Sequence, residues 1–425
     1  MIGWYREVSR DQWKAFLATF LGWVLDGFDF TILTFVIIDI EKSFTIDSAL
    51  AGALGTVTMF MRLIGGIAAG TAADRWGRKG PLMLSILWFS IFACLSGFST
   101  SYAMLFGFRA LFGIGMGGEW AAGMPLTIEH WPARLRGTVS GMLQGGFAWG
   151  YILSAVVFQN IYPLLHSKPD LGWRVMFWVG VIPALLVLWI RSGVSESPVW
   201  LERQKHLNEN QLKDRISFLR LFKKDLLGIT IHTSILLTVF MFSYHSSTFW
   251  YATYLRQSGI RPFWYVISLN IGGILGGAVW GRVSETKLGR RGAATMGAIV
   301  GILGIPFFLL IRDPLLGIIG AVMIGIGSGM WGVIPTYLSE RFPTSARSVG
   351  SGFAYHAGAA IGSLTPTLIG ALKDRGMALN IAMSWFIAAS YLTAILMMWA
   401  GPETAGVQLS SFDEKKSDAA LPAHH

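Results

Sequence analysis

The chain has 425 residues, of which 53% are hydrophobic and only 14% are charged, and its formal net charge is +10. Soluble domains carry about 25% charged residues. The composition therefore excludes a disordered chain and argues against an ordinary soluble enzyme, because too little polar surface would cover so much apolar volume. It is typical of a membrane protein. A single cysteine, Cys94, excludes an intrachain disulfide and a cysteine-based metal cluster.

A helix that crosses the membrane needs about 20 mostly apolar residues. The sequence predicts twelve such stretches and hence an all-α membrane protein with 12 transmembrane helices. In chain order they are Trp13–Ile38, Ala49–Ala72, Leu82–Phe98, Tyr102–Ile128, Thr138–Tyr162, Trp173–Ile190, Leu227–Leu255, Phe263–Gly281, Ala293–Leu310, Leu315–Leu338, Val349–Leu372 and Leu379–Ala400.

The distribution of basic residues predicts the orientation. With alternating sides, and with Lys14 and Arg174 at the ends of spans counted with the adjoining loops, 24 Lys and Arg residues lie on the side that holds both termini and 8 on the other, and two more lie deeper within the spans. Basic loops face the cytoplasm, so we expect both termini to be cytoplasmic in a multi-pass protein of the cell (inner) membrane. The polar stretch 191–226 divides a six-helix bundle, 1–190, from a second one, 227–400, which a cytoplasmic tail, 401–425, follows.

Two segments of the chain repeat at a spacing of 211 residues. The repeated residues are Glu129, Pro132, Arg136 and Gly141 after the fourth span, and Glu340, Pro343, Arg347 and Gly352 after the tenth. A second pair of loops carries Gly70, Asp74, Gly77, Arg78 and Lys79 in the first half and Gly281, Glu285, Gly289, Arg290 and Arg291 in the second. Parallel repeats of six helices are typical of transporters that rock about a site near the membrane midplane.

These loops, and the glycine run that Arg109 leads in the fourth span, resemble the major facilitator superfamily over nearly the whole chain. The resemblance implies two pseudo-symmetric six-helix bundles that alternate between inward-open and outward-open states. The charges at the cytoplasmic helix ends are expected to form a gate, with Asp74 beside Arg78 and Glu129 beside Arg136. Their counterparts in the second half are Glu285, Arg290, Glu340 and Arg347. The alternative is that these charges only satisfy the topology rule.

Five charged residues lie within predicted spans of the first half: Asp26, Asp29, Arg62, Arg109 and Glu119. A charge that faces lipid at the bilayer centre costs about 2.5–3.5 kcal/mol. These side chains are therefore expected to face the bundle interior or a water-filled cavity.

Asp26 and Asp29 are three residues apart, so both carboxylates point to one face of the helix. Two acids so close in a low dielectric do not both ionise easily, and one is expected to carry the coupling proton while Arg62 balances the other. The alternative is a static Asp–Arg ion pair. Glu119 is either a further proton carrier or the partner of a cation. Arg109 is interpreted as a substrate or energy-coupling residue, or as a packing residue.

The second half offers a histidine and hydroxyl groups. His245, Ser246 and Ser247 are expected to bind an oxygen-rich anionic substrate, although a lone intramembrane histidine is often structural. The repeat relates Trp120 and Trp331, which are candidate pocket walls. No nucleophile elbow, phosphate loop or metal-ligand motif is present, and the basic residues are scattered, which argues against nucleic-acid binding.

The Asp-Gly-Phe-Asp string of the first span, Arg62, Gly117–Trp120 and the Glu-Ser-Pro sequence at 196–198 resemble the sialate:proton symporter branch of the superfamily. This resemblance implies a proton-coupled symporter, not an enzyme, that imports sialic acid or a lactate-like monocarboxylate, works as a monomer and needs no cofactor besides the proton gradient. An aromatic acid:proton symporter is the alternative, since it shares the first-span motif. A membrane sensor without transport is a distant alternative.

Overall fold

The computed structural model describes residues 5, 7–46, 48–165, 169–181, 185, 189, 193–209, 218–260, 263–311, 313–407 and 409. In this part of the chain all regular elements are helices. The first half contains α1 (Arg10–Phe44), α2 (Ser48–Trp76), α3 (Lys79–Ser96), α4 (Tyr102–His130), η2 (Ala133–Leu135), α5 (Arg136–Ile161), η3 (Tyr162–Leu165) and α6 (Pro169–Val179).

The connection between the halves contains α8 (Pro198–Glu209) and η4 (Phe218–Phe222). The second half contains α9 (Lys224–Thr248), α10 (Tyr251–Gln257), α11 (Phe263–Val283), α12 (Gly289–Ile305), the π-helical η5 (Pro306–Leu310), α13 (Pro314–Ser328), η6 (Gly329–Val333), α14 (Ile334–Arg341), η7 (Thr344–Ala346), α15 (Arg347–Gly362), α16 (Thr365–Asp374) and α17 (Leu379–Ala400).

Local sequence signals explain several helix ends. Ser9 forms a capping box with Gln12 at the start of α1, and Ser101 and Asp313 accept backbone N–H bonds at the starts of α4 and α13. Gly77 and Gly289 have φ angles of 98° and 66°, which only glycine adopts readily. These two glycines occupy equivalent places in the repeated loop, so the repeat preserves a backbone turn.

Nine helical segments in the described part of the chain are long and apolar enough to cross a membrane. Three expected spans are not among them. The span expected over Tyr102–Ile128 is the helix α4, which contains Arg109 and Glu119; the span over Val349–Leu372 is divided into α15 and α16; and residues 182–184, 186–188 and 190 of Trp173–Ile190 lie outside the described residues. The all-helical class of the prediction is confirmed.

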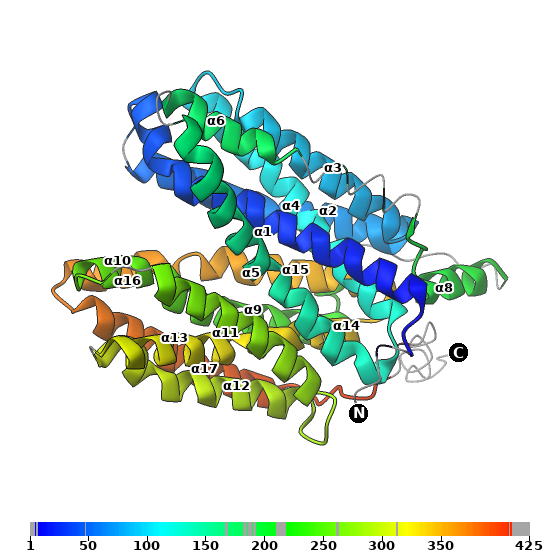
Figure 1. The fold of residues 1–425 in the computed structure, drawn as a ribbon. Coiled ribbons are helices and arrows are strands. Elements are labelled where there is room, and N and C mark those ends of the chain that lie inside the picture. The colour runs from blue at the N-terminus through cyan, green and yellow to red at the C-terminus, as the bar shows by residue number, and fades with distance from the viewer. Residues whose placement is uncertain are drawn as a thin grey trace.

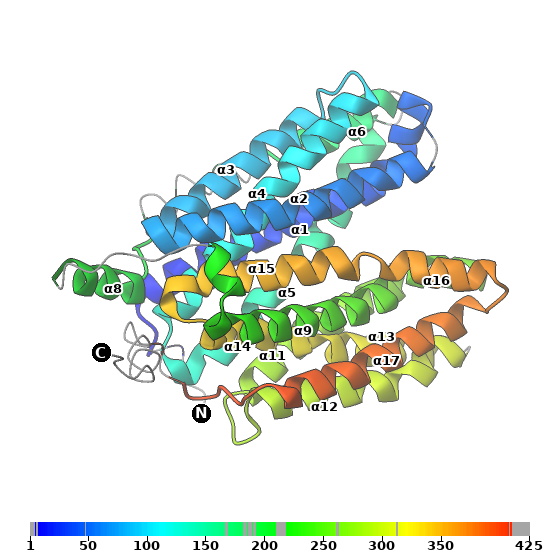
Figure 2. The same cartoon turned by 180° about the vertical axis from the view of Figure 1, so that it is seen from behind.

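Two groups of helices are visible in Figures 1 and 2, one formed by α1 to α6 and the other by α9 to α17. The groups lie close together at the end that carries α8 and the start of α1, and they diverge toward α6, α10 and α16. Between the groups, α2 packs against α15 and α5 packs against α11. Because α4 packs against α2 and α15, and α1 packs against α5, these helices lie where the two groups meet. Most of the predicted site residues of the first half are on α1, α2 and α4.

Candidate functional site

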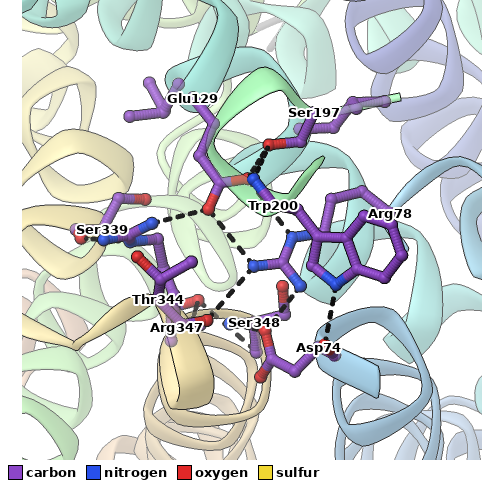
Figure 3. Close-up of polar contacts among 12 residues, drawn as sticks. Asp74, Arg78, Glu129, Ser197, Trp200, Ser339, Thr344, Arg347 and Ser348 are labelled. Carbon is purple, nitrogen blue, oxygen red and sulfur yellow. Dashed lines mark hydrogen bonds and ion pairs between the residues drawn. The ribbon is translucent and has the colours of Figure 1, made fainter. Parts of the chain in front are cut away.

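A buried polar cluster joins the two helix groups where α2 and α4 end and α15 begins (Figure 3). Asp74, near the end of α2, accepts hydrogen bonds from the backbone N–H groups of Ser348 (3.1 Å) and Val349 (2.9 Å) at the start of α15. Asp74 is fully buried, and a buried carboxylate is stable only when it is paired. Asp74 of the first repeat therefore stabilises the first turn of α15, which belongs to the second repeat.

Glu129 is the centre of this cluster. Arg78, which also contacts Asp74 at 2.8 Å, lies 3.2 Å from Glu129, and the Nη1 atom of Arg347 donates to Glu129 across the halves at 2.6 Å. Ser197 also donates to this carboxylate. The expected pairing of Glu129 with Arg136 is thus wrong, because Arg347 of the other half takes that place.

The ionisation of Glu129 follows from these contacts. Glu129 lies just beyond the span predicted over Tyr102–Ile128. Burial acts to raise the pKa of Glu129, but the positive charges of Arg78 and Arg347 outweigh it and lower the pKa to about 2. The carboxylate is therefore ionised throughout the physiological pH range, and its two arginine partners are held by a full charge.

The equivalent acid of the second half is paired differently. Arg290 contacts Glu340 at 3.0 Å and Glu285 at 3.2 Å, so its two ion pairs stay within the second half. Glu285 also accepts a hydrogen bond from the backbone N–H of Gly137 at the start of α5, which crosses between the halves. Glu403 accepts from the N–H groups of Arg290 and Arg291, as Glu196 does from those of Arg78 and Lys79.

Arg136 makes its contacts with backbone oxygens. Its guanidinium donates to the carbonyls of Ile128 (3.2 Å), Trp131 (3.1 Å) and Val407 (3.1 Å), and its own carbonyl accepts from the Thr336 hydroxyl at 2.9 Å. All eight residues predicted for a gate therefore lie at one end of the molecule. Their pairing is asymmetric, although the sequence repeat suggested two equivalent pairs.

The charges of the first span meet those of the second near the centre of the first half. The Nη2 atom of Arg62 donates to the Oδ2 atom of Asp26 at 3.1 Å, and both side chains are buried. The other Asp26 oxygen and the Arg62 Nε atom have no partner among the described residues. The sequence predicts that Arg62 balances one of the two acids without identifying it; the acid that Arg62 contacts is Asp26, and the pair leaves hydrogen-bonding capacity on both side chains.

Three further charges nearby are buried and incompletely paired. Among the described residues, the three guanidinium nitrogens of Arg109 and both carboxylate oxygens of Glu119 have no hydrogen-bond partner. The Oδ2 atom of Asp29 also has none. The Arg109 guanidinium lies 4.1 Å from the centre of the Phe112 ring, a cation–π contact. Glu119 lies against Gly22, where a Cβ atom would come within 2.7 Å of its Oε1 atom.

The predicted hydroxyl group of α9 is not joined to these charges by any contact recorded in the described part of the chain. Ser246 and Ser247 donate to the carbonyl of Ser243 in their own helix, at 3.1 and 3.0 Å. His245 is half-buried, and its ring contacts that of Tyr244. The role of His245, Ser246 and Ser247 in substrate binding stays a prediction.

The two tryptophans that the repeat relates do come together, around a residue that sequence reasoning missed. Tyr355 of α15 stacks on Trp120 of α4 with ring centroids 4.2 Å apart and an interplanar angle of 18°. Trp331 of η6 and Trp23 of α1 meet the same tyrosine ring edge-on, each at 6.1 Å. A signal was available: Tyr355 and His356 interrupt a run of small residues in α15.

His356 makes one more contact between the halves. Its Nε2 atom lies 2.9 Å from the carbonyl oxygen of Gly117 in α4, and Gly66 of α2 leaves room for the imidazole ring. The side chain is fully buried. This hydrogen bond, the Trp120–Tyr355 stack and the Glu129–Arg347 pair connect α4 to α15 along its length.

Comparison with known proteins agrees with this arrangement. The chain is 33% identical, over 100% of its length and 97% of the relative, to a protein of Cupriavidus pinatubonensis described as a probable 4-methylmuconolactone transporter. It is 30% identical to the sialic acid transporter NanX of Escherichia coli, over 95% of this chain and 97% of the relative. The predicted resemblance to sialate transporters is thereby confirmed.

The fold also matches solved structures. The structure of the proton:xylose symporter XylE superposes with a TM-score of 0.77 at 19% identity, covering 95% of this chain and 99% of that one. The family model described as Major Facilitator Superfamily matches residues 19–366. The chain therefore belongs to the Major Facilitator Superfamily, whose members are membrane transporters and not enzymes.

Proposed function

We propose that the protein is a secondary active transporter that imports a small organic anion together with a proton, by alternating access. It works in the cell (inner) membrane as a monomer with both termini in the cytoplasm, and the proton gradient is its only energy source. With this orientation the polar cluster around Glu129 closes the cytoplasmic side, and the conformation described above faces outward.

The group of buried charges in the first half carries the proposal. Burying a charge without a partner costs several kcal/mol. Glu119, Asp29 and Arg109 all have charged atoms without a hydrogen-bond partner among the described residues, and a purely structural role does not explain three such residues in one half. A proton and an anionic substrate would satisfy them together. The proton neutralises an acid of the Asp26, Asp29 and Glu119 set, and the substrate carboxylate binds Arg62 or Arg109.

Charge balance then couples binding to movement. When both ligands are bound, the net charge that must be occluded between the halves is lower, so the free-energy cost of closing the outer side falls. The cross-half contacts of Asp74, Glu129 and Glu285 break as the inner side opens. Release of either ligand to the cytoplasm restores the unpaired charges and favours the outward-facing state.

Two substrate classes follow from the relatives. The Escherichia coli relative is a sialic acid transporter, which supports sialic acid or a lactate-like monocarboxylate. The Cupriavidus relative is described as a probable 4-methylmuconolactone transporter, a substrate other than a sialate, which keeps the aromatic acid class as the alternative. A competition panel of lactate, sialic acid and 4-hydroxybenzoate against labelled substrate separates the two classes.

Uptake by proteoliposomes under an inward proton gradient tests the mechanism. We expect the Asp26→Asn, Asp29→Asn double variant to lose gradient-driven accumulation but to keep counterflow of labelled substrate, because exchange needs no net proton movement. Asp11→Asn, which changes an exposed acid at the start of α1, is the control. Unchanged gradient-driven accumulation in the double variant would exclude a proton role for this pair.

A further inference from the structure

The four aromatic rings around Tyr355 form an enclosure built by both halves. Trp120 faces the tyrosine ring at 4.2 Å, and Trp23 and Trp331 approach it edge-on with interplanar angles of 73° and 72°. Trp23, Trp120 and Tyr355 are each at most 6% exposed, and Trp331 is partly buried. The Tyr355 ring therefore stacks on Trp120 and lies between Trp23 and Trp331, whose rings are roughly perpendicular to it.

The indole N–H groups of this enclosure are unsatisfied. The Nε1 atoms of Trp23, Trp120 and Trp331 are buried and have no partner in the described part of the chain. Several other indoles donate to backbone carbonyls, as Trp131, Trp200 and Trp280 do at 2.7–3.1 Å, and the only further buried indole nitrogen without a partner among the described residues is that of Trp178. An indole nitrogen is a donor only, and a buried unsatisfied donor costs about 1–3 kcal/mol. Three such donors around one ring indicate a ligand rich in acceptors.

A positive charge lies beside the enclosure. The Arg62 guanidinium carbon is 5.8 Å from the centre of the Trp23 ring, and Arg62 Nε is buried without a partner while Nη2 holds Asp26. A carboxylate could accept from Nε without displacing Asp26. A flat aromatic base, three N–H donors and a guanidinium together match a planar conjugated carboxylate that carries further oxygen acceptors.

No ring fits between Trp120 and Tyr355 as they stand, because stacked rings with a guest between them would be about 7 Å apart. The two side chains belong to different halves, however, so movement of α15 relative to α4 separates them. We infer that a planar conjugated carboxylate binds on the face of Trp120 that Tyr355 covers here, and that Tyr355 takes the place of the substrate ring in this conformation. This inference rests on the proposed function and names its substrate class.

Binding to the purified full-length protein in detergent tests the inference, with 4-hydroxybenzoate and cyclohexanecarboxylate as a planar and a saturated probe of equal charge. We expect 4-hydroxybenzoate to bind more tightly by a factor of about two to ten. Trp120→Leu is expected to abolish this preference, and Trp120→Phe to retain part of it because a ring remains. Tyr355→Leu is expected to tighten binding of 4-hydroxybenzoate, since no ring has to be displaced.

Tyr251 provides the matched control, because it stacks at 4.0 Å on Phe308 of its own half, is buried, and has a hydroxyl without a hydrogen-bond partner among the described residues. Tyr251→Leu should leave the preference unchanged.

Equal binding of the two probes, or equal weakening by Tyr355→Leu and Trp120→Leu, would overturn the inference. Gradient-driven uptake of sialic acid or lactate, with no planar preference, would overturn it while the proposed function holds. Planar binding without any gradient-driven uptake would instead refute the proposed function.

Discussion

At the scale of single residues, the molecule separates charges that hold its shape from charges that lack partners. Asp74, Glu129 and Arg290 are buried and fully engaged in ion pairs or backbone hydrogen bonds. Glu119 and Arg109 are equally buried, yet their charged atoms have no hydrogen-bond partner among the described residues. Perturbed, unpaired charges of this kind are typical of functional sites, and they are the positions where substitution should change transport more than folding.

Glu119 provides the sharpest test of this separation. Glu119→Gln removes the charge but keeps the size of the side chain, which packs closely against Gly22. We expect unchanged or higher thermal stability, because no buried charge is left unpaired, and at least about a tenfold loss of gradient-driven accumulation with counterflow retained. Glu209→Gln, at an exposed ion pair with Lys205, is the control. Lower stability with normal accumulation would instead identify Glu119 as the partner of a structural cation.

The sequence predicted that Arg62 would balance one of Asp26 and Asp29, because charges within spans must find one another, but it did not identify which; the partner is Asp26. It could not predict that Arg347, and not Arg136, would contact Glu129, since the repeat makes both arginines equivalent in spacing. Nor could it identify Tyr355, because the stack with Trp120 depends on the register of α15 against α4. Contacts within one half follow from helix periodicity, whereas contacts between halves depend on their relative position.

At the scale of elements, glycines set how closely the two halves approach. On α5, a Cβ atom at Gly141 would collide with the backbone carbonyl of Gly277 in α11, and Gly281 meets Gly137 and Gly141 in the same way. Small residues allow such close helix contacts in membranes. The glycines of the repeated segments therefore have a packing role beyond the turns formed by Gly77 and Gly289.

A larger side chain at this contact should prevent the halves from closing. We expect Gly141→Val to lower the initial rate of substrate uptake at least about tenfold, because the closed conformation would have to absorb overpacking of about 1–3 kcal/mol. Gly107→Val is the matched control, since a Cβ atom at this α4 glycine meets nothing within 4 Å. Equal loss of uptake in both variants would point to impaired helix insertion and not to the contact between α5 and α11.

At the scale of the whole molecule, the cross-half bonds are concentrated at the end near the termini, where Figure 1 shows the two helix groups closest together. Asp74 reaches the start of α15, Arg347 reaches Glu129, and Gly137 reaches Glu285. The sequence placed all of these charges at one side of the membrane. The structure adds that three of the contacts are bonds between halves, so they oppose opening at this end.

The ionisation of Glu129 predicts how this closure responds to pH. Its pKa is about 2 in the folded protein, below the ordinary value of 4.5, because Arg78 and Arg347 outweigh the effect of burial. A depressed pKa stabilises the closed form fully above pH 4.5, and the contribution is lost as the pH falls toward 2. Protonation of Glu129 therefore does not open this end of the molecule at physiological pH. Under the proposed function, substrate and proton binding at the centre opens it.

Neutralising Glu129 by mutation should then open this end directly. We expect Glu129→Gln to lengthen the distance between spin labels at the exposed positions Arg75 and Lys287, measured by pulsed electron paramagnetic resonance in a Cys94→Ala background, because Arg347 loses its charged partner in the other half. Glu340→Gln is the matched control: it removes an equally buried carboxylate whose ion pair with Arg290 stays within one half. The labels should not move apart in that variant. Equal lengthening in both variants would mean that loss of any buried ion pair loosens this end, and that the bond from Glu129 to Arg347 has no special part in holding the halves together.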